Sequence, residues 1–117
     1  MLLQDVLELL QARVLTGEEF LQKEIVDCFG SDMMSEVLAY CKSNSLLCTG
    51  LTNMQVVRTA DMTELGAIVF VRNKVPSQEV IDRAEEDMLP LLATEMTLFE
   101  ACGILYQAGL KSCHKGE

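Results

Sequence analysis

The clearest pattern of hydrophobic and polar positions lies between Gly66 and Leu92. Ala67 to Val71 is an unbroken apolar run, short enough for a strand and without polar alternation. Such a run is typical of a strand covered on both faces, so we predict a central strand here. Pro76 and Ser77 then predict the start of a helix, because Pro fits a first helical turn and Ser caps it.

The helix predicted after Ser77 has an apolar side and an acidic side. Its apolar residues recur at helical spacing, at Val80, Ile81, Ala84 and Met88. This pattern is typical of a helix that lies on a sheet with its acidic side in water. Leu89 to Leu92 begins the next strand. A strand, a helix and a second strand in this short span predict a parallel, right-handed unit.

The rest of the chain predicts more helices and strands in alternation. Apolar stripes indicate helices near 2–10, 33–42, 52–60 and 97–106, and short apolar runs indicate strands at 24–29 and 45–48. Residues 13–15 are a weaker candidate for a strand. Together these elements predict one α/β domain of three layers, with a mostly parallel sheet of about four to five strands and helices on both faces. We expect residues 1–110 to form this domain and residues 111–117 to be a flexible tail.

Several helix starts have their own polar signals. Thr52 with Gln55, and Thr97 with Glu100, have the spacing of a capping box. The segment 30–32, Gly-Ser-Asp, is expected to end a strand and cap the helix that follows.

Charge and composition limit the partners. The chain has 117 residues, with 18 acidic and nine Lys or Arg side chains and a net charge of -9. This balance argues against nucleic acid and against anionic membranes as partners. Apolar runs stay well below the about 20 residues needed to span a bilayer, and the N-terminus lacks a cationic leader. We therefore expect a cytoplasmic protein.

The five cysteines form an odd set without a Cys-x-x-Cys pair: Cys28, Cys41, Cys48, Cys102 and Cys113. This is neither a disulfide framework nor a zinc signature. Cys28, Cys48 and Cys102 have apolar neighbours in the sequence, where a free cysteine behaves as a small hydrophobic residue. A core role is therefore favoured over a redox or metal role for these three.

Three predicted connections meet at one edge of the sheet, because ligands of open parallel sheets bind beyond the carboxyl ends of the strands. These connections, 48–53, 71–77 and 92–97, offer hydroxyl, amide and cationic groups that suit an anion or a nucleotide phosphate. The candidate ligand-binding residues are Thr49, Gly50, Thr52, Asn53, Arg72, Asn73, Lys74, Thr94 and Thr97. Alternatively, the hydroxyl and amide side chains only cap helices and the two cations only solvate a loop, since capping alone explains each residue.

Signals for catalysis are weak. The sequence lacks a G-x-x-x-x-G-K-[ST] loop, a G-x-G-x-x-G fingerprint and a G-x-S-x-G elbow. His114, the single histidine, falls in the expected tail, and Glu85, Glu86 and Asp87 are typical of a solvated helix face. We expect no catalytic residue, no cofactor and no metal ligand.

Longer stretches of the sequence resemble the DRTGG-domain family over nearly the whole chain. They are 31–37, 51–60, 67–72 with 76–77, 90–94 and 99–103. The string Asp-Arg-Thr-Gly-Gly itself does not occur, but Thr49-Gly50 and Val71-Arg72-Asn73 lie where parts of it are expected. Such domains are also similar to the N-terminal domain of HPr kinase/phosphorylase. Stand-alone copies are often labelled serine kinase for that reason, although the P-loop of the kinase domain is absent from this sequence.

The resemblance implies an α/β regulatory module. Members of the family are found fused to CBS pairs, to nucleotide-controlled pyrophosphatases and to phosphotransacetylases, and relatives commonly pair as dimers. Stand-alone copies are similar to those encoded near iron-only hydrogenase genes in anaerobes.

Three functions follow from these patterns. The first is a non-enzymatic sensor that binds a small anionic metabolite or an adenine nucleotide at the three-loop edge and signals through a homodimer. The second is an interaction module without a small ligand, in which residues 2–10 and 98–106 mediate dimerisation and docking to a protein partner, with a link to iron-only hydrogenase or energy metabolism. The third and weakest is an enzyme that transfers phosphate from ATP.

Overall fold

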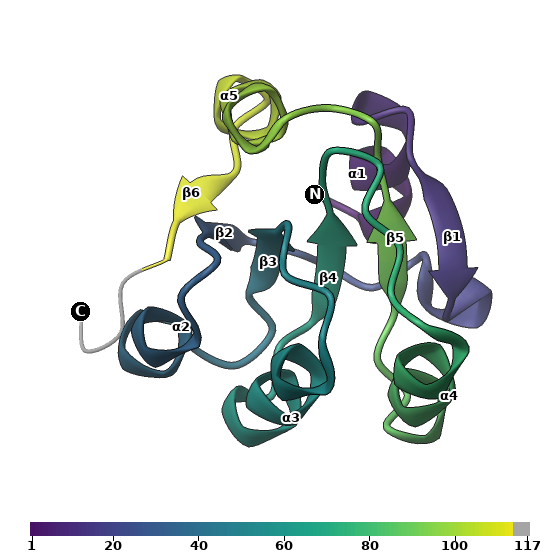
Figure 1. Ribbon diagram of the computed structural model, residues 1–117. Helices are drawn as coiled ribbons and strands as arrows, with labels where there is room; N and C mark the ends of the chain where they lie inside the picture. The colour runs from purple at the N-terminus through teal and green to yellow at the C-terminus, as the bar shows by residue number, and fades with distance from the viewer. Residues whose placement is uncertain (114–117) are drawn as a thin grey trace.

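A mixed sheet lies between two layers of helices in the computed structural model, which describes residues 1–113 (Figure 1). The strands are β1 (Arg13–Thr16), β2 (Asp27–Gly30), β3 (Leu46–Thr49), β4 (Ala67–Phe70), β5 (Leu91–Ala93) and β6 (Lys111–Ser112). The helices are α1 (Leu3–Leu9), α2 (Met34–Tyr40), α3 (Met54–Thr63), α4 (Gln78–Glu86), α5 (Leu98–Gln107) and the short 3-10 helix η1 (Glu18–Phe20). The α/β fold of three layers predicted from the sequence is confirmed.

The order of the strands across the sheet is β1-β5-β4-β3-β2-β6. β4 pairs in parallel with β3 and β5, and β2 pairs in parallel with β3 and β6. β1 at the other edge runs antiparallel to β5. The central position predicted for β4 is confirmed, and all four of its residues are buried.

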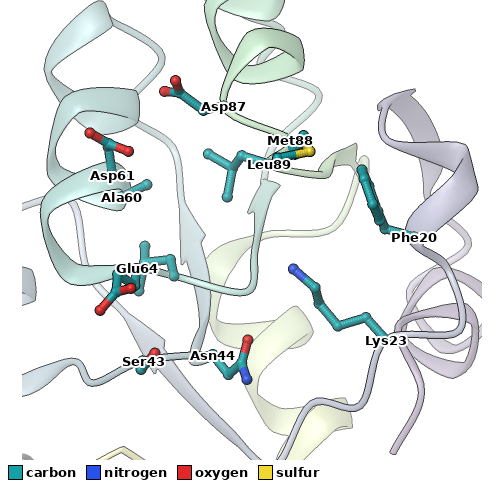
Figure 2. A pocket seen from close by; sticks show the side chains of 11 residues that line it. Phe20, Lys23, Ser43, Asn44, Ala60, Asp61, Glu64, Asp87, Met88 and Leu89 are labelled. Carbon is teal, nitrogen blue, oxygen red and sulfur yellow. The ribbon is translucent and has the colours of Figure 1, made fainter.

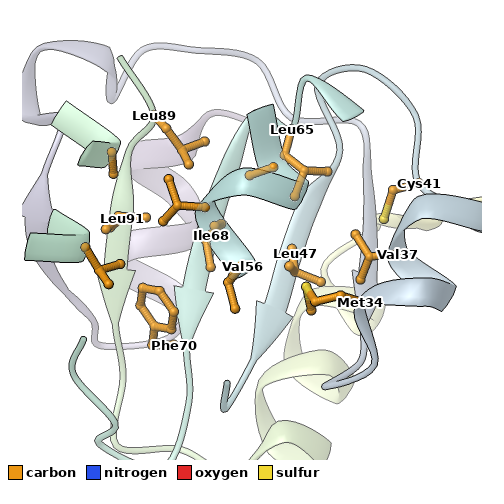
Figure 3. Close-up of a cluster of buried hydrophobic side chains, with 14 of the residues drawn as sticks. Met34, Val37, Cys41, Leu47, Val56, Leu65, Ile68, Phe70, Leu89 and Leu91 are labelled. Atoms are coloured by element: carbon orange, nitrogen blue, oxygen red, sulfur yellow. The ribbon is translucent and has the colours of Figure 1, made fainter. Parts of the chain in front are cut away.

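Each face of the sheet has its own apolar core, because alternate residues of a strand point to opposite faces. Leu47, Ile68 and Phe70 pack against α2, α3 and α4 on one face (Figure 3). Leu46 and Val69 belong to the other core, with α1 and α5. The α2, α3 and α4 layer lies below the sheet in Figure 1, whereas α1 and α5 lie above it. The expected covering of both faces is thus confirmed.

The number of strands is six rather than the four to five that we expected. The difference comes from the chain end, where Lys111 and Ser112 pair with Asp27 and Cys28 and Cys113 is buried. The expectation of a flexible tail from residue 111 is therefore wrong for 111–113. The remainder of that expected tail, with His114, lies outside the described residues. Within residues 1–113, every helix is too short or too polar to cross a bilayer.

The predicted caps have different outcomes. Thr97 and Glu100 form the expected capping box, and Ser77 caps α4 by accepting the Val80 N–H. The capping box predicted for Thr52 is wrong, because α3 begins one residue later than that box requires, with Asn53 as its N-cap. The cap predicted from 30–32 is also shifted. Met33 is the N-cap of α2, and the Asp32 side chain is directed elsewhere.

Candidate ligand-binding site

Four loops lie at the carboxyl edge of the sheet because β2, β3, β4 and β5 are parallel. They are residues 31–33, 50–53, 71–77 and 94–97, and each leads into a helix. Three of them are the connections predicted from the sequence. The fourth, after β2, joins them because β2 lies next to β3.

The carboxylate of Asp32 connects the β2 loop to the β3 loop. Its Oδ1 accepts a hydrogen bond of 2.7 Å from the Gly50 N–H and one of 2.9 Å from the Thr49 hydroxyl. The Thr49 oxygen in turn accepts the Leu51 N–H at 3.1 Å. An anionic group of the protein is therefore held by donors that suit an anionic ligand.

The guanidinium of Arg72 brings the β4 loop to the same point. Its Nη2 lies 3.9 Å from Asp32 Oδ2, with side chains that are 45% and 48% exposed respectively. It also lies against Gly50, where a β-carbon would collide with it. Such an exposed ion pair contributes only about 0–1 kcal/mol. Asp32 therefore holds Arg72 only lightly.

The backbone of Arg72 and Asn73 is strained and fixed to the β5 loop. Both residues have a φ of 56°, in the left-handed region that side chains with a β-carbon disfavour. The Arg72 N–H donates to Met96 O at 2.7 Å and the Asn73 N–H donates to Thr94 O at 2.9 Å. Hydrogen bonds and one ion pair thus run across the edge from Asp32 to Met96. A positive φ also occurs outside this edge, at Gln11, Asn44, Glu64 and Met88, so it does not by itself mark a site.

The predicted site residues take different places at this edge. The structure brings together Thr49, Gly50, Arg72, Asn73 and Thr94 through the contacts above. The Thr94 hydroxyl is buried and donates to Leu10 O at 2.7 Å, so it points into the protein. Lys74, Thr52 and Asn53 belong to the same loops, and Lys74 and Asn53 are exposed.

Thr97 serves its own helix. Its hydroxyl caps α5 by accepting the Glu100 N–H at 3.2 Å, and it donates to Glu100 Oε1 at 3.0 Å. These hydrogen bonds from the Thr97 N–H and hydroxyl lower the pKa of the Glu100 carboxyl. A role in capping therefore accounts for Thr97.

Asp32 is the residue of this site that the sequence analysis did not include. Its position is a usable signal, since Asp32 is the second residue after β2, as Arg72 is the second residue after β4. From the sequence, we interpret Asp32 as part of a helix cap. The interpretation was wrong because its carboxylate reaches the neighbouring loop instead of α2.

A cavity of about 440 Å³ lies at the opposite edge of the sheet (Figure 2). Three carboxylates line it, from Asp61 on α3, from Glu64 at the C-cap of α3 and from Asp87 at the C-cap of α4. The one lysine in its lining, Lys23, donates to Gly66 O at 3.1 Å, and burial lowers the pKa of its ammonium group. An acidic lining of this kind repels phosphate groups, so this cavity does not suit an anionic ligand.

Within residues 1–113, the His, Cys, Asp and Glu side chains form no group of three or more that could hold a metal ion.

The fold and the carboxyl edge define a small α/β domain of the class that offers loops for a ligand beyond the ends of parallel strands. The sequence model of one family, the DRTGG domain, matches residues 5–108. The chain therefore belongs to the DRTGG-domain family, as the resemblance in the sequence implied. Among curated proteins, none matches this chain.

A solved structure shares the fold over almost the whole chain. It is the crystal structure of the CBS and DRTGG domains of the regulatory region of Clostridium perfringens pyrophosphatase, complexed with an activator, diadenosine tetraphosphate. The TM-score is 0.71 at 15% sequence identity, and the match covers 96% of this chain and 50% of the other. The chain thus spans about half the length of that structure, and the likeness is one of fold.

Proposed function

We propose that this chain is a non-enzymatic regulatory domain that senses a small anionic metabolite or an adenine nucleotide at the carboxyl edge of its sheet. The observation that carries this proposal is the group formed by Arg72, Gly50 and Asp32, in which a guanidinium and a backbone N–H hold a carboxylate. A ligand phosphate would replace the Asp32 carboxylate on the same donors. Phosphates bind well to such combinations of backbone N–H groups and Arg.

Two further observations support a nucleotide. Lys74 is exposed in the Arg72 loop and makes no ion pair with another residue of the described part of the chain, 1–113. The DRTGG-containing region with the same fold is regulatory and was crystallised with diadenosine tetraphosphate. Membership of the same family makes a regulatory role for this chain the simplest proposal.

A thermal-shift panel tests the proposal. The purified chain would be heated with ATP, ADP, AMP, diadenosine tetraphosphate and pyrophosphate in separate samples. A ligand present at about 100 times its Kd adds about 2.7 kcal/mol to the free energy of unfolding, so at least one compound should raise the Tm by several degrees. Absence of a shift with every compound would refute sensing of these anions.

Variants locate the binding site. Arg72→Ala and Lys74→Ala should each reduce the ligand-induced shift, because each removes a cation from the loop after β4. Gly50→Ala should also reduce it, since the new β-carbon displaces the flexible end of Arg72. Arg58→Ala is the matched control, because Arg58 is an exposed arginine that lies on α3 and not in one of these loops. Equal losses of the ligand-induced shift with Arg58→Ala would mean that only net charge matters.

A regulatory domain without enzymatic activity should not hydrolyse ATP above the rate of the buffer blank.

We also propose that the chain signals as a homodimer through the outer side of α5. Phe99 is 88% exposed and Tyr106 is 74% exposed. With Gly103 between them, they form a stripe along one side of α5, because residues 99, 103 and 106 are at helical spacing. A β-carbon at Gly103 would have no neighbour within 4 Å, so another helix can approach closely there. The second candidate function, a pure docking module, depends on this same surface.

Light scattering tests the dimer. The wild-type chain should have the mass of two copies, and Phe99→Glu should give a monomer because a charge would be buried at the interface. Met62→Glu is the control, since Met62 is 70% exposed on the other helical layer. A dimer that does not respond to any ligand would favour the docking module. A monomer at high concentration would count against α5 as a dimer interface, both in the sensor and in the docking module.

A further inference from the structure

Three cysteine thiols meet between the sheet and α5. Cys28 on β2 and Cys48 on β3 have their Sγ atoms 3.7 Å apart. The Cys102 thiol on α5 lies against Gly30 of β2 and lines the same cavity as Cys28. Gly30 allows this approach, because a β-carbon there would lie 2.6 Å from Cys102 Sγ. Three cysteines that are far apart in the sequence thus form one thiol cluster, Cys28, Cys48 and Cys102.

The three thiols differ in their access to solvent. Cys48 is fully buried, whereas Cys28 and Cys102 are partly exposed. Cys28, Cys102 and Gly30 line a cavity of about 170 Å³ that is open at the surface. A water molecule occupies about 30 Å³ in the liquid, so the cavity has room for a molecule a few times larger than water. A small hydroperoxide can therefore enter it and reach both of these thiols.

The three thiols affect one another's pKa. The neighbouring Cys28 and Cys48 thiols lower the pKa of Cys102, although partial burial acts in the opposite direction. The Cys102 and Cys28 thiols, together with burial, raise the pKa of Cys48. The pKa of Cys28 is also raised, chiefly by the Cys102 thiol. Cys28 and Cys102 both line the cavity, and Cys102 is the one of the two whose pKa is lowered.

Strand register decides which pair can form a disulfide. Cys28 lies beside Leu46 and Cys48 lies beside Gly30, so the two cysteines are offset by two residues on neighbouring strands. With strands about 4.8 Å apart and a rise of about 3.3 Å per residue, their Cα atoms are about 8 Å apart. Disulfides need Cα atoms closer than about 7 Å. The disulfide must therefore include Cys102, and Cys28 is the partner that shares its cavity.

We propose that the thiol cluster is an oxidation site for hydroperoxides, in which Cys102 is the reacting thiol, Cys28 the resolving thiol and Cys48 a buried positioning thiol. In the first step, Cys102 Sγ attacks the distal oxygen of ROOH, an S–O bond forms, the O–O bond breaks and ROH leaves after taking a proton. In the second step, Cys28 Sγ attacks the oxidised sulfur, and water leaves as the S–S bond forms. The two thiols give up two electrons and the hydroperoxide becomes an alcohol and water. The product joins α5 to β2.

Peptide mapping of the whole chain after treatment with hydrogen peroxide tests this inference. Cleavage after Lys and Arg places Cys28 and Cys41 in the peptide 24–42 and Cys102 in the peptide 84–111, so fragmentation of the linked peptides must place the bond at Cys28. We expect these two peptides to become linked, with the loss of two hydrogen atoms, and to separate again with dithiothreitol. Linkage between copies of the chain, or between other cysteines, would overturn the assignment. A loss of free thiols that a chelator reverses and dithiothreitol does not reverse would also overturn it, because such a loss indicates a bound metal ion and not a disulfide.

Variants assign the three roles. Cys102→Ser should slow thiol oxidation at pH 6 about tenfold or more, because the remaining thiols are protonated there. In Cys28→Ser, oxidation should stop at the sulfenic acid of Cys102, because the resolving thiol is absent. Dimedone should trap this sulfenic acid. In Cys48→Ser, the rate of oxidation should depend on pH as the rate of an ordinary thiol does and rise towards alkaline pH. A merely structural role of Cys48 would leave the pH dependence of the rate unchanged. Cys113→Ala is the control and should leave the rate unchanged, since the Cys113 thiol lies in the other core, where it contacts Ser45 and Tyr40 O.

A measurement on the wild-type chain keeps the test valid if a variant fails to fold. Limited alkylation with iodoacetamide at pH 6, followed by peptide mapping, should label Cys102 first. Labelling of Cys113 or Cys28 before Cys102, or equal slow labelling of all five cysteines, would overturn the proposal.

Discussion

At the carboxyl edge of the sheet, backbone N–H groups, Arg72 and Lys74 gather where α3, α4 and α5 begin. At the opposite edge, α3 and α4 end beside the carboxylates of Asp61 and Asp87. Helix dipoles add positive potential to the first edge and negative potential to the second. The cavity in Figure 2 lies at the second edge, whereas the charge that an anion needs lies at the first. The position of an anion site is indicated by the charge and not by the cavity, because enclosed volume does not offset the repulsion between a phosphate and three carboxylates.

The two edges do not differ in the kind of bonds that hold their loops. The carboxyl edge is held by hydrogen bonds that join one loop to the next, between Asp32 and the Thr49-Gly50 segment and from Arg72 and Asn73 to the β5 loop. The cavity edge has bonds of the same kind, from the Asn44 N–H to Glu64 O at 2.9 Å and from Lys23 to Gly66 O at 3.1 Å. A site that is held in place before the ligand arrives loses less conformational freedom on binding. The predictions below separate residues that build the carboxyl edge from residues that contact a ligand there.

The largest effect is expected at Thr94. Thr94→Val removes a buried hydroxyl that donates to Leu10 O and accepts the Met96 N–H. Leaving these groups without a partner should lower the free energy of unfolding by about 1–3 kcal/mol. Urea denaturation would measure the loss. Thr52→Val is the control, because Thr52 is only partly buried, and it should change stability much less. Equal losses in both variants would show that the Thr94 hydroxyl does not hold the edge together.

The next effect concerns the strained backbone. Arg72→Gly should be more stable than Arg72→Ala by about 1 kcal/mol, because glycine adopts a φ of 56° without the cost that a β-carbon imposes. The same pair of substitutions at Lys74 is the control. Lys74 is not among the residues of positive φ, so glycine there should be no more stable than alanine. Denaturation midpoints of the four variants give the comparison, and no advantage for glycine at residue 72 would contradict the strain.

Thr97 distinguishes capping from ligand binding. Thr97→Ala should lower the free energy of unfolding by about 1 kcal/mol, since it removes an N-cap and a capping box. The nucleotide-induced change in Tm should stay the same. Thr97→Ser should restore the stability. A loss of the ligand response in Thr97→Ala would make Thr97 a ligand contact as well as a cap.

The capping box also predicts a dependence on pH. The folded state lowers the pKa of Glu100 below 4.5, so its contribution to stability is present above pH 4.5 and disappears as the pH falls through the lowered pKa. The Tm difference between the wild-type chain and Glu100→Gln should therefore shrink in acid. A difference that is constant from pH 7 to pH 3 would show that the charge of Glu100 is not involved.

The smallest effect is expected at the acid-lined edge. The double substitution Asp61→Asn and Glu64→Gln should change the free energy of unfolding by less than about 0.5 kcal/mol, because both side chains are exposed. It should also leave the nucleotide-induced shift unchanged. Isothermal titration with the best ligand from the panel would check this. Tighter binding of more than a few fold in the double variant would place the anion in the cavity of Figure 2 instead.

Local patterns in the sequence were sufficient for much of the architecture. The continuous apolar run of 67–71 required a strand covered on both faces, and β4 is that strand. The Thr97 capping box and the Ser77 cap were also predicted correctly, because a cap involves residues only three positions apart. Periodicity and capping depend on neighbours in the chain, so the sequence determined the helices themselves, although the caps of α2 and α3 lie one residue later than predicted.

Only the tertiary structure decided the features that join distant segments. The pairing of Lys111 and Ser112 with β2, the contact of Asp32 with Gly50 and the meeting of Cys28, Cys48 and Cys102 all depend on the order of the strands. A short polar strand such as β6 has no apolar pattern of its own and becomes a strand because β2 lies beside it. Such contacts form after loops have closed over tens of residues, and the sequence pattern holds no record of which segments will become neighbours.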